Sequence, residues 1–298
     1  MSDVTTPLAA THDILTAAAR VAGLDSTGAE VIRDGSNVIY RLPGDVVARI
    51  GHAGFQETAE RDVRVSRWLT TAGLPVVHVL NDVPQPTMVD DRPVTWWKLL
   101  PEHRPATTGE LGAVLRSLHS LTPPDDLDLP VHDPFSGLSN RISQATALDY
   151  YDRTWLTHRL DQLRERYRRL PMGKPYRVIH GDAWQGNVAV PDSAPPTLLD
   201  LEHMSIGHPD WDLVPIAVDH TDFARLTTAD YDAFATAYGG YDVTTTPAFR
   251  TLADIEELRW VCFVLSKSAT STHAARETRH RVACLRGDTP RPWTWVAF

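Results

Sequence analysis

Residues 178–188 read VIHGDAWQGNV, and residues 197–202 read TLLDLE. In each stretch a short apolar run is followed by an acid, Asp182 in the first and Asp200 in the second. A carboxylate just beyond a buried strand is held rigidly, and a metal ligand or a general base needs that rigid placement. The two stretches therefore predict a β-rich site within a part of the chain that is otherwise mostly helical.

The residue types in these stretches fit phosphoryl transfer. That reaction needs an acceptor hydroxyl oriented for in-line attack and divalent cations that neutralise the phosphates. Mg²⁺ prefers oxygen ligands, which Asp182, Asn187 and Asp200 supply. Asp and Asn are also common turn residues, and that alternative stays open for each residue taken alone. The complete string, with Asn five residues past the Asp of His-Gly-Asp and then Asp-Leu-Glu, is more specific than a turn requires.

This string resembles the signature of the aminoglycoside phosphotransferase family, whose members share the protein-kinase-like fold. The family includes kinases for antibiotics, choline, homoserine and sugars. The resemblance implies a phosphotransferase with an alcohol group as acceptor, in which Asp182 is the catalytic base and His180 orients the loop. It also implies that Asn187 and Asp200 hold Mg²⁺. The match runs in order from about residue 32 to residue 216.

A further part of the family pattern follows at residues 207–213, which read GHPDWDL. There the resemblance implies that Asp212 accepts hydrogen bonds from the backbone of the catalytic loop and so supports it. The alternative role for Asp212 is that of a helix N-cap. The resemblance weakens after residue 218, where members of the family usually contact the acceptor.

The order of predicted elements indicates an α+β, two-lobed, protein-kinase-like fold. An N-terminal antiparallel sheet with one main helix forms a nucleotide-binding lobe over residues 1–100. A larger, mostly helical lobe at 101–298 carries catalysis and acceptor binding, and a hinge lies at about 99–102. The spacing of apolar residues, caps and turns predicts helices at 14–21, 56–72, 110–121 and 155–170, strands at 29–33, 38–42, 46–50, 76–80 and 94–99, and a β-rich segment at 177–201.

The N-terminal strands are expected to cover a nucleotide, although the chain has no Walker A string and no Gly-x-Gly-x-x-Gly. Ser36 and Asn37 lie in the turn between the first two strands, where they reach phosphate oxygens or simply form a hairpin turn. In the third strand, Val47 is expected against the purine and Arg49, two residues on, against the phosphates. The hinge at Leu99-Leu100 would read the purine edge, with one of the two preceding tryptophans near the pocket.

Arg49 stands where kinases of this fold carry a lysine, and no lysine precedes Lys98. Such kinases pair that cation with a glutamate on the next helix. Here the matching position is Asp62, because helical spacing places it on the inward face with Val65, whereas Glu60 is rotated by about 200°. The sequence therefore predicts an Arg49–Asp62 ion pair at the nucleotide site. A surface arginine with an unrelated helix acid is the alternative.

The acceptor pocket is expected to be built from the C-terminal helices, roughly residues 135–170 and 203–275. Acids there would suit a polycationic aminoglycoside, although solvated helix acids are common. Three function hypotheses remain: a kinase for an antibiotic or aminosugar, as in aminoglycoside-type antibiotic resistance; a kinase for a nucleoside antibiotic, a macrolide, or a metabolite such as a sugar or homoserine; and an inactive kinase-like binding protein. The candidate acceptor-binding residues are Glu202, Asp219, Asp222 and Glu257, and further acids that fit either reading are Asp254 and Glu256.

The composition limits the ligands, partners and cellular location that we expect for the protein. The net charge of −9 disfavours duplex nucleic acid as a partner. The chain has no uninterrupted apolar run of about eighteen residues, so no membrane span is expected. The N-terminus lacks the pattern of a secretory signal. The two cysteines lack metal-type spacing, and a reducing cytoplasm fits them best. The expected ligands are Mg²⁺, ATP or GTP as phosphate donor, and a small hydroxyl-bearing acceptor, with no nucleic acid and no membrane.

Overall fold

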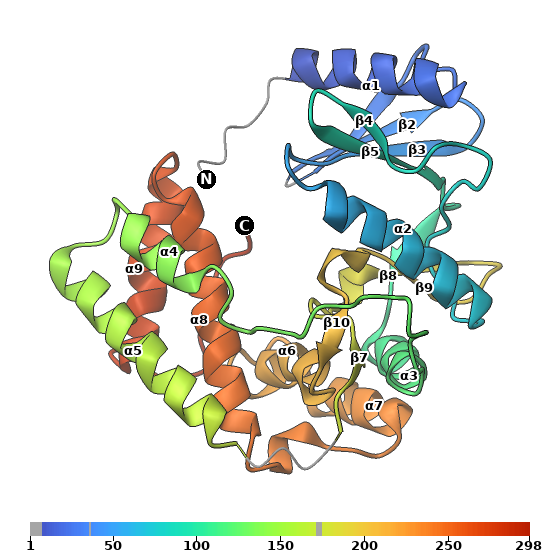
Figure 1. Ribbon diagram of the computed structural model, residues 1–298. Helices are drawn as coiled ribbons and strands as arrows, with labels where there is room; N and C mark the ends of the chain where they lie inside the picture. The colour runs from blue at the N-terminus through green and yellow to red at the C-terminus, as the bar shows by residue number, and fades with distance from the viewer. Residues whose placement is uncertain (1–7, 36, 171–174) are drawn as a thin grey trace. The chain divides into compact units, whose positions relative to one another are not determined.

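The computed structural model describes residues 8–35, 37–170 and 175–298 (Figure 1). It has an N-terminal antiparallel sheet and a larger helical part, which confirms the predicted α+β class. The chain divides into two compact units that alternate along the sequence. We call them the sheet unit, which comprises the residues up to Ala106, Leu121–Leu129 and Gly186–Met204, and the helical unit, which comprises Thr107–Ser120, Pro130–Gln185 and Ser205–Phe298.

The sheet unit is built on a five-stranded sheet in which all neighbouring strands are antiparallel. The strands predicted at 38–42 and 46–50 are confirmed, and they pair as an antiparallel hairpin. Their period-two alternation and the intervening turn at Pro43-Gly44-Asp45 favour a single pairing register. The spatial order of the strands is β1 (Glu30–Asp34), β2 (Val38–Leu42), β3 (Val46–Ile50), β5 (Arg92–Lys98) and β4 (Thr87–Val89).

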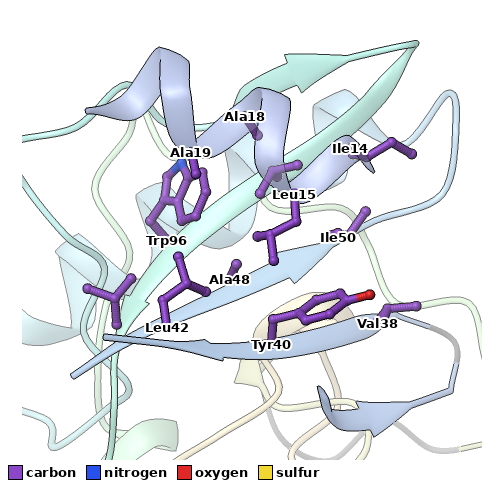
Figure 2. Packing of buried hydrophobic residues seen from close by; sticks show 12 residues of the cluster. Ile14, Leu15, Ala18, Ala19, Val38, Tyr40, Leu42, Ala48, Ile50 and Trp96 are labelled. Atoms are coloured by element: carbon purple, nitrogen blue, oxygen red, sulfur yellow. The ribbon is translucent and has the colours of Figure 1, made fainter. Parts of the chain in front are cut away.

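One helix covers each face of this sheet. Helix α1 (Leu8–Ala22) places Leu15 and its apolar neighbours over Tyr40 and Trp96 (Figure 2). Helix α2 (Gln56–Thr71) covers the opposite face, where Val63 packs with Trp97. The adjacent tryptophans therefore point to opposite faces, as strand alternation requires.

Two predictions in this unit are wrong. The helix predicted at 14–21 begins earlier, at Leu8, because the alanines that follow Leu8 are strong helix formers. The strand predicted at 76–80 is not continuous. Its backbone bridges Leu198 at Val76 and then Trp97 at Val79, so it changes partner before a ladder can form.

A second sheet in the sheet unit carries the later β-rich stretch. It has the strand order β6 (His103–Pro105), β8 (Val188–Pro191), β9 (Thr197–Leu198). The β8–β9 hairpin brings the residues at its two open ends together, and the Leu199 N–H donates to the carbonyl of Asn187 at 2.9 Å. Two short 3₁₀ turns flank this hairpin, η1 (Gln185–Asn187) and η2 (Leu201–His203).

The helical unit contains the remaining helices and a two-stranded sheet of β7 (Arg177–Ile179) and β10 (Ser205–Gly207). Two predicted helices begin earlier than expected, at caps formed by Thr107 with Glu110 and by Asp149. Within the described residues, no helix is long and apolar enough to cross a membrane. The helices of this unit are α3 (Thr108–His119), α4 (Leu138–Gln144), α5 (Tyr150–Arg168), α6 (Asp210–Thr221), α7 (Thr228–Tyr238), α8 (Phe249–Lys267) and α9 (Thr272–Arg286), with a 3₁₀ turn η3 (Val243–Thr245).

Helices α3 and α7 approach so closely that Gly112 admits no side chain. A Cβ added there would lie 2.5 Å from the carbonyl oxygen of Phe234. We predict that Gly112→Ala lowers the free energy of unfolding by about 1–3 kcal/mol, because the helices must move apart. On the same helix, a Cβ at Gly109 would meet Ala233 at an ordinary 3.7 Å. Gly109→Ala is therefore the control, and equal losses for both variants in urea unfolding would contradict the prediction.

Candidate active site

A pocket of about 330 Å³ lies within the sheet unit. Its lining includes most residues that the sequence assigned to the nucleotide and the metal. Ser36, the remaining loop residue of that set, lies outside the described residues. The predicted residues that line the pocket are Asn37, Val47, Arg49, Leu99, Leu100, Asn187 and Asp200, and the apolar side chains that join them include Ile39, Val77, Trp97, Leu199 and Leu201.

The predicted Arg49–Asp62 ion pair is confirmed. Arg49 Nη1 donates to Asp62 Oδ2 at 3.2 Å. Asp62 is 3% exposed and shares the inward face of α2 with Val65 and Leu69, whereas Glu60 is partly exposed. The helical periodicity of α2 therefore identified the correct acid.

The other terminal nitrogen of Arg49 faces two further acids. Nη2 donates to Glu202 Oε2 and lies 3.9 Å from Asp200 Oδ1. Burial raises the pKa of Asp62 to about 7, against the opposing charge of Arg49, and the charges of Glu202 and Asp200 also raise it. The other oxygen of Asp62, Oδ1, is buried and has no hydrogen-bond partner among the described residues.

The β8–β9 hairpin positions the two candidate metal ligands. Asn187 precedes β8 and Asp200 follows β9, and both line the pocket that Arg49 lines. Asp200 has a left-handed backbone conformation with φ of 52°. An amide oxygen and a carboxylate form a donor set that suits Mg²⁺, which is usually bound by one or two protein oxygens together with phosphate oxygens and water. The residues present therefore fit the metal that the family resemblance implies.

The helical unit holds the other part of the predicted chemistry. Asp182 is exposed, and its backbone N–H donates to Nδ1 of the fully buried His180 at 3.3 Å. The predicted support by Asp212 is confirmed, because its carboxylate accepts from the backbone N–H groups of His180 at 2.7 Å and Gly181 at 2.8 Å. These bonds hold the turn that carries the exposed carboxylate.

His119 is a site residue that the sequence reasoning missed. Its Nε2 lies 2.9 Å from the Asp212 carboxylate, and its Nδ1 lies 2.8 Å from the Tyr238 hydroxyl. Burial would raise the pKa of Asp212, but the contacts with His119 and His180 hold it below its ordinary value. A signal was available, because His119 follows Leu115 by four residues on the inward face of α3.

The acids predicted for the acceptor side are not solvated surface groups. Asp222, Asp254, Glu256 and Glu257 are buried, so the surface alternative is wrong for them, and Asp219 is partly buried. Each of the five has at least one arginine partner, supplied by the helices of this unit or by the segments that follow α6 and α9. The pairs are Asp219 with Arg225, Asp222 with Arg250 and Arg291, Asp254 with Arg159, Arg166 and Arg250, Glu256 with Arg259, and Glu257 with Arg250 and Arg291.

Glu257 and Asp222 share one arginine pair but differ in ionisation. Burial, together with the hydrogen bond to Asp222, raises the pKa of Glu257 to about 8, against the opposing charge of Arg250. Burial also opposes ionisation of Asp222, but that hydrogen bond and Arg250 keep its pKa below the ordinary value. Near neutral pH, Glu257 is therefore the protonated member and Asp222 the ionised one.

This difference in ionisation predicts different effects on stability for the two amide variants, Glu257→Gln and Asp222→Asn. The folded state keeps the Glu257 proton over a pH range in which the unfolded state releases it. Wild-type stability should therefore fall, relative to Glu257→Gln, by on the order of 1 kcal/mol per pH unit between about pH 5 and 8. Asp222→Asn should destabilise at neutral pH, because it removes the ionised partner of Arg250 and Arg291. Urea unfolding at several pH values tests both, and a pH-independent difference for Glu257→Gln would contradict the assignment.

Comparisons with solved structures show that other proteins have a similar fold. The chain resembles an amicoumacin kinase, hAmiN, solved with AMP-PNP, Ca²⁺ and Ami, at a TM-score of 0.74 and 13% identity over 93% of each chain. It also resembles a choline/ethanolamine kinase family protein from Mesorhizobium loti, at a TM-score of 0.66 and 17% identity over 94% of this chain and 95% of that one. The aminoglycoside phosphotransferase APH(3'')-Id from Streptomyces rimosus matches at a TM-score of 0.61 and 21% identity over 85% and 98%.

At these identities the structural likeness establishes the fold. A search of curated protein sequences gave no match. The model of the phosphotransferase enzyme family matches residues 29–253, which is most of the chain and includes both stretches that suggested the chemistry. The chain therefore belongs to the phosphotransferase enzyme family.

Proposed function

We propose that this phosphotransferase moves the γ-phosphate of ATP or GTP to a hydroxyl group of a small acceptor, an antibiotic or an aminosugar. One observation carries the proposal: Arg49, held by a buried acid, lines the same pocket as Asn187 and Asp200. A fixed cation beside a pair of oxygen ligands is what a metal-bound polyphosphate needs. The similar amicoumacin kinase, solved with AMP-PNP, supports the proposal for the nucleotide.

The apolar part of the pocket would take the purine. Val47 and Trp97 lie on neighbouring strands in register, so their side chains share one face. Leu99 and Leu100 would border the base at the hinge, between lobes at 1–100 and 101–298. Mg²⁺ on Asn187 and Asp200 would neutralise phosphate charge, while Arg49 and the loop residues Ser36 and Asn37 would hold phosphate oxygens.

Asp182 is the proposed base. The proton of the acceptor hydroxyl would pass to its exposed carboxylate as the oxygen attacks phosphorus. His180 and Asp212 would keep the loop backbone in place through the hydrogen bonds described above. Acceptor contacts are proposed from residues 135–170 and 203–275, and they include Asp219, Asp222 and Glu257.

The arginine partners of these acids favour a second candidate. Each predicted acceptor acid in the helical unit already has an arginine partner, so a polycation would have to displace a guanidinium. A neutral or singly charged acceptor needs no such exchange. A nucleoside antibiotic, a macrolide, a sugar or homoserine is therefore the alternative to an aminoglycoside.

A nucleotide-consumption screen distinguishes the candidates. The protein, Mg²⁺ and either ATP or GTP would be incubated with aminoglycosides, macrolides, nucleoside antibiotics, choline, sugars and homoserine in separate reactions. Acceptor-dependent release of nucleoside diphosphate, with a phosphorylated product seen by mass spectrometry, supports the proposal. Nucleotide binding without turnover on any acceptor would favour an inactive kinase-like binding protein.

Asp182→Asn tests the proposed base. The amide keeps the shape of the side chain but cannot accept the proton. We expect kcat to fall by about 10²–10⁴ while the Kd for nucleotide stays within about twofold. Single-turnover kinetics and calorimetric titration measure the two quantities. Wild-type turnover in Asp182→Asn would remove the base assignment, and a loss of nucleotide binding would point to misfolding.

The Arg49–Asp62 pair predicts a compensating double variant. Arg49→Lys should raise the nucleotide KM by roughly tenfold, because lysine is shorter and falls short of Asp62. Asp62→Glu adds one methylene and should restore most of that loss when combined with Arg49→Lys. A double-mutant cycle on kcat/KM measures the coupling. Additive effects would mean that the pair has no role at the nucleotide.

A further inference from the structure

The carboxylate of Glu202 binds the two side chains that the proposed function gives to phosphate. Its Oε2 accepts from Arg49 Nη2 and, at 3.2 Å, from Asn37 Nδ2. These donors lie on β3 and in the turn between β1 and β2, more than 150 residues from Glu202 in sequence. The sequence assigned Glu202 to the acceptor, but its carboxylate lies among the donors of the sheet unit.

The two ends of the Arg49 guanidinium have different surroundings. Nη1 faces Asp62, which is deeply buried on α2. Nη2 faces Glu202, whose side chain is 23% exposed. A buried partner exchanges with solvent or ligand far less readily than a partly exposed one, because its charge has no alternative solvation. The Asp62 contact is therefore the fixed one and the Glu202 contact is the exchangeable one.

A carboxylate and a phosphate present the same group to these donors, an anionic oxygen that accepts charge-assisted hydrogen bonds. With Glu202 in place, Arg49 Nη2 and Asn37 Nδ2 are both occupied. Three carboxylates then surround one guanidinium, those of Asp62, Asp200 and Glu202. A polyphosphate that approaches this arrangement meets excess negative charge until one carboxylate leaves.

We propose that Glu202 is an internal substitute for the nucleotide phosphate, which occupies the anion site of Arg49 and Asn37 in the absence of nucleotide and lowers nucleotide affinity. The inference rests on the proposed function. Nucleotide binding displaces Glu202 and transfers Nη2 and Nδ2 to phosphate oxygens, while Asp62 retains Nη1. Glu202 and Asp62 therefore act in opposite directions on the same cation.

Two isosteric variants test this opposition. Glu202→Gln replaces the anionic competitor by a neutral amide, and Asp62→Asn does the same to the fixed partner. We expect the Kd for ADP or GDP to fall roughly twofold to fivefold in Glu202→Gln, the upper part of the range of a partly exposed charge pair, and to rise in Asp62→Asn. Titration calorimetry in EDTA, with each nucleotide, keeps any effect on Mg²⁺ at the neighbouring Asp200 out of the measurement.

A further variant guards against a folding artefact. Glu202→Asp keeps the charge but is one methylene shorter, so it should release at least one of the two donors and also tighten binding. Thermal unfolding of each variant confirms that it is folded. Unchanged or weaker nucleotide binding by folded Glu202→Gln would show that Glu202 only positions Arg49, and would overturn the inference.

The outcome also separates this inference from the proposed function. If the wild-type protein binds ADP or GDP and Glu202→Gln does not bind more tightly, only the inference fails. If neither nucleotide binds to any variant, with or without Mg²⁺, the proposed function fails and the inference fails with it.

Discussion

A carboxylate without access to water, that of Asp62, constrains the whole sheet unit. Removing such a group from water costs several kcal/mol unless a fixed cation compensates it. Arg49 is that cation, and the 3.2 Å contact forms only if α2 keeps its rotation and β3 its register. A shift of β3 by one residue would turn Arg49 to the face covered by α1, where Ala48 and Ile50 now pack. The ion pair and the apolar pattern therefore specify the same arrangement.

The helical unit uses a buried acid in a different way. Asp212 is fully buried, but its partners are mostly backbone N–H groups, those of His180 and Gly181. Backbone donors cannot rotate away, so the acid fixes the shape of the loop that ends at Asp182 rather than the position of a cation. His119 completes the set with a side-chain donor. One unit thus orients a charge and the other orients a loop, each through a carboxylate withdrawn from solvent.

The sequence pattern predicted those features of the fold that depend on residues close together in the chain. The hairpin of β2 and β3 follows from alternation and a turn cluster, and helical spacing alone separated Asp62 from Glu60. Partners far apart in sequence could not be found this way. Nothing near Glu202 indicates that its carboxylate meets Arg49, 153 residues earlier.

The same limit explains the errors. The segment at 76–80 has strand composition but lacks a strand, because its pairing is decided by Leu198 and Trp97 rather than by its own residues. The acids of α8 appeared solvated because several of the arginines that pair with them come from other elements, Arg159 and Arg166 from α5 and Arg291 from the C-terminal segment. Ion-pair partners that lie on distant elements with no shared pattern, such as Arg291 and Glu257, are not revealed by a single sequence.

The alternation of the two units along the chain has a consequence for synthesis. Strand β6 and the segment around Val76 pair with β8 and β9, which are made roughly 85 to 120 residues later. During translation the sheet unit must therefore wait, with these edges unpaired, until the chain has grown past Met204. Much of the helical unit emerges in that interval. The sheet unit is thus expected to be completed on the ribosome only once the middle of the sequence has emerged, and its exposed strand edges make that interval the one in which a chaperone matters most.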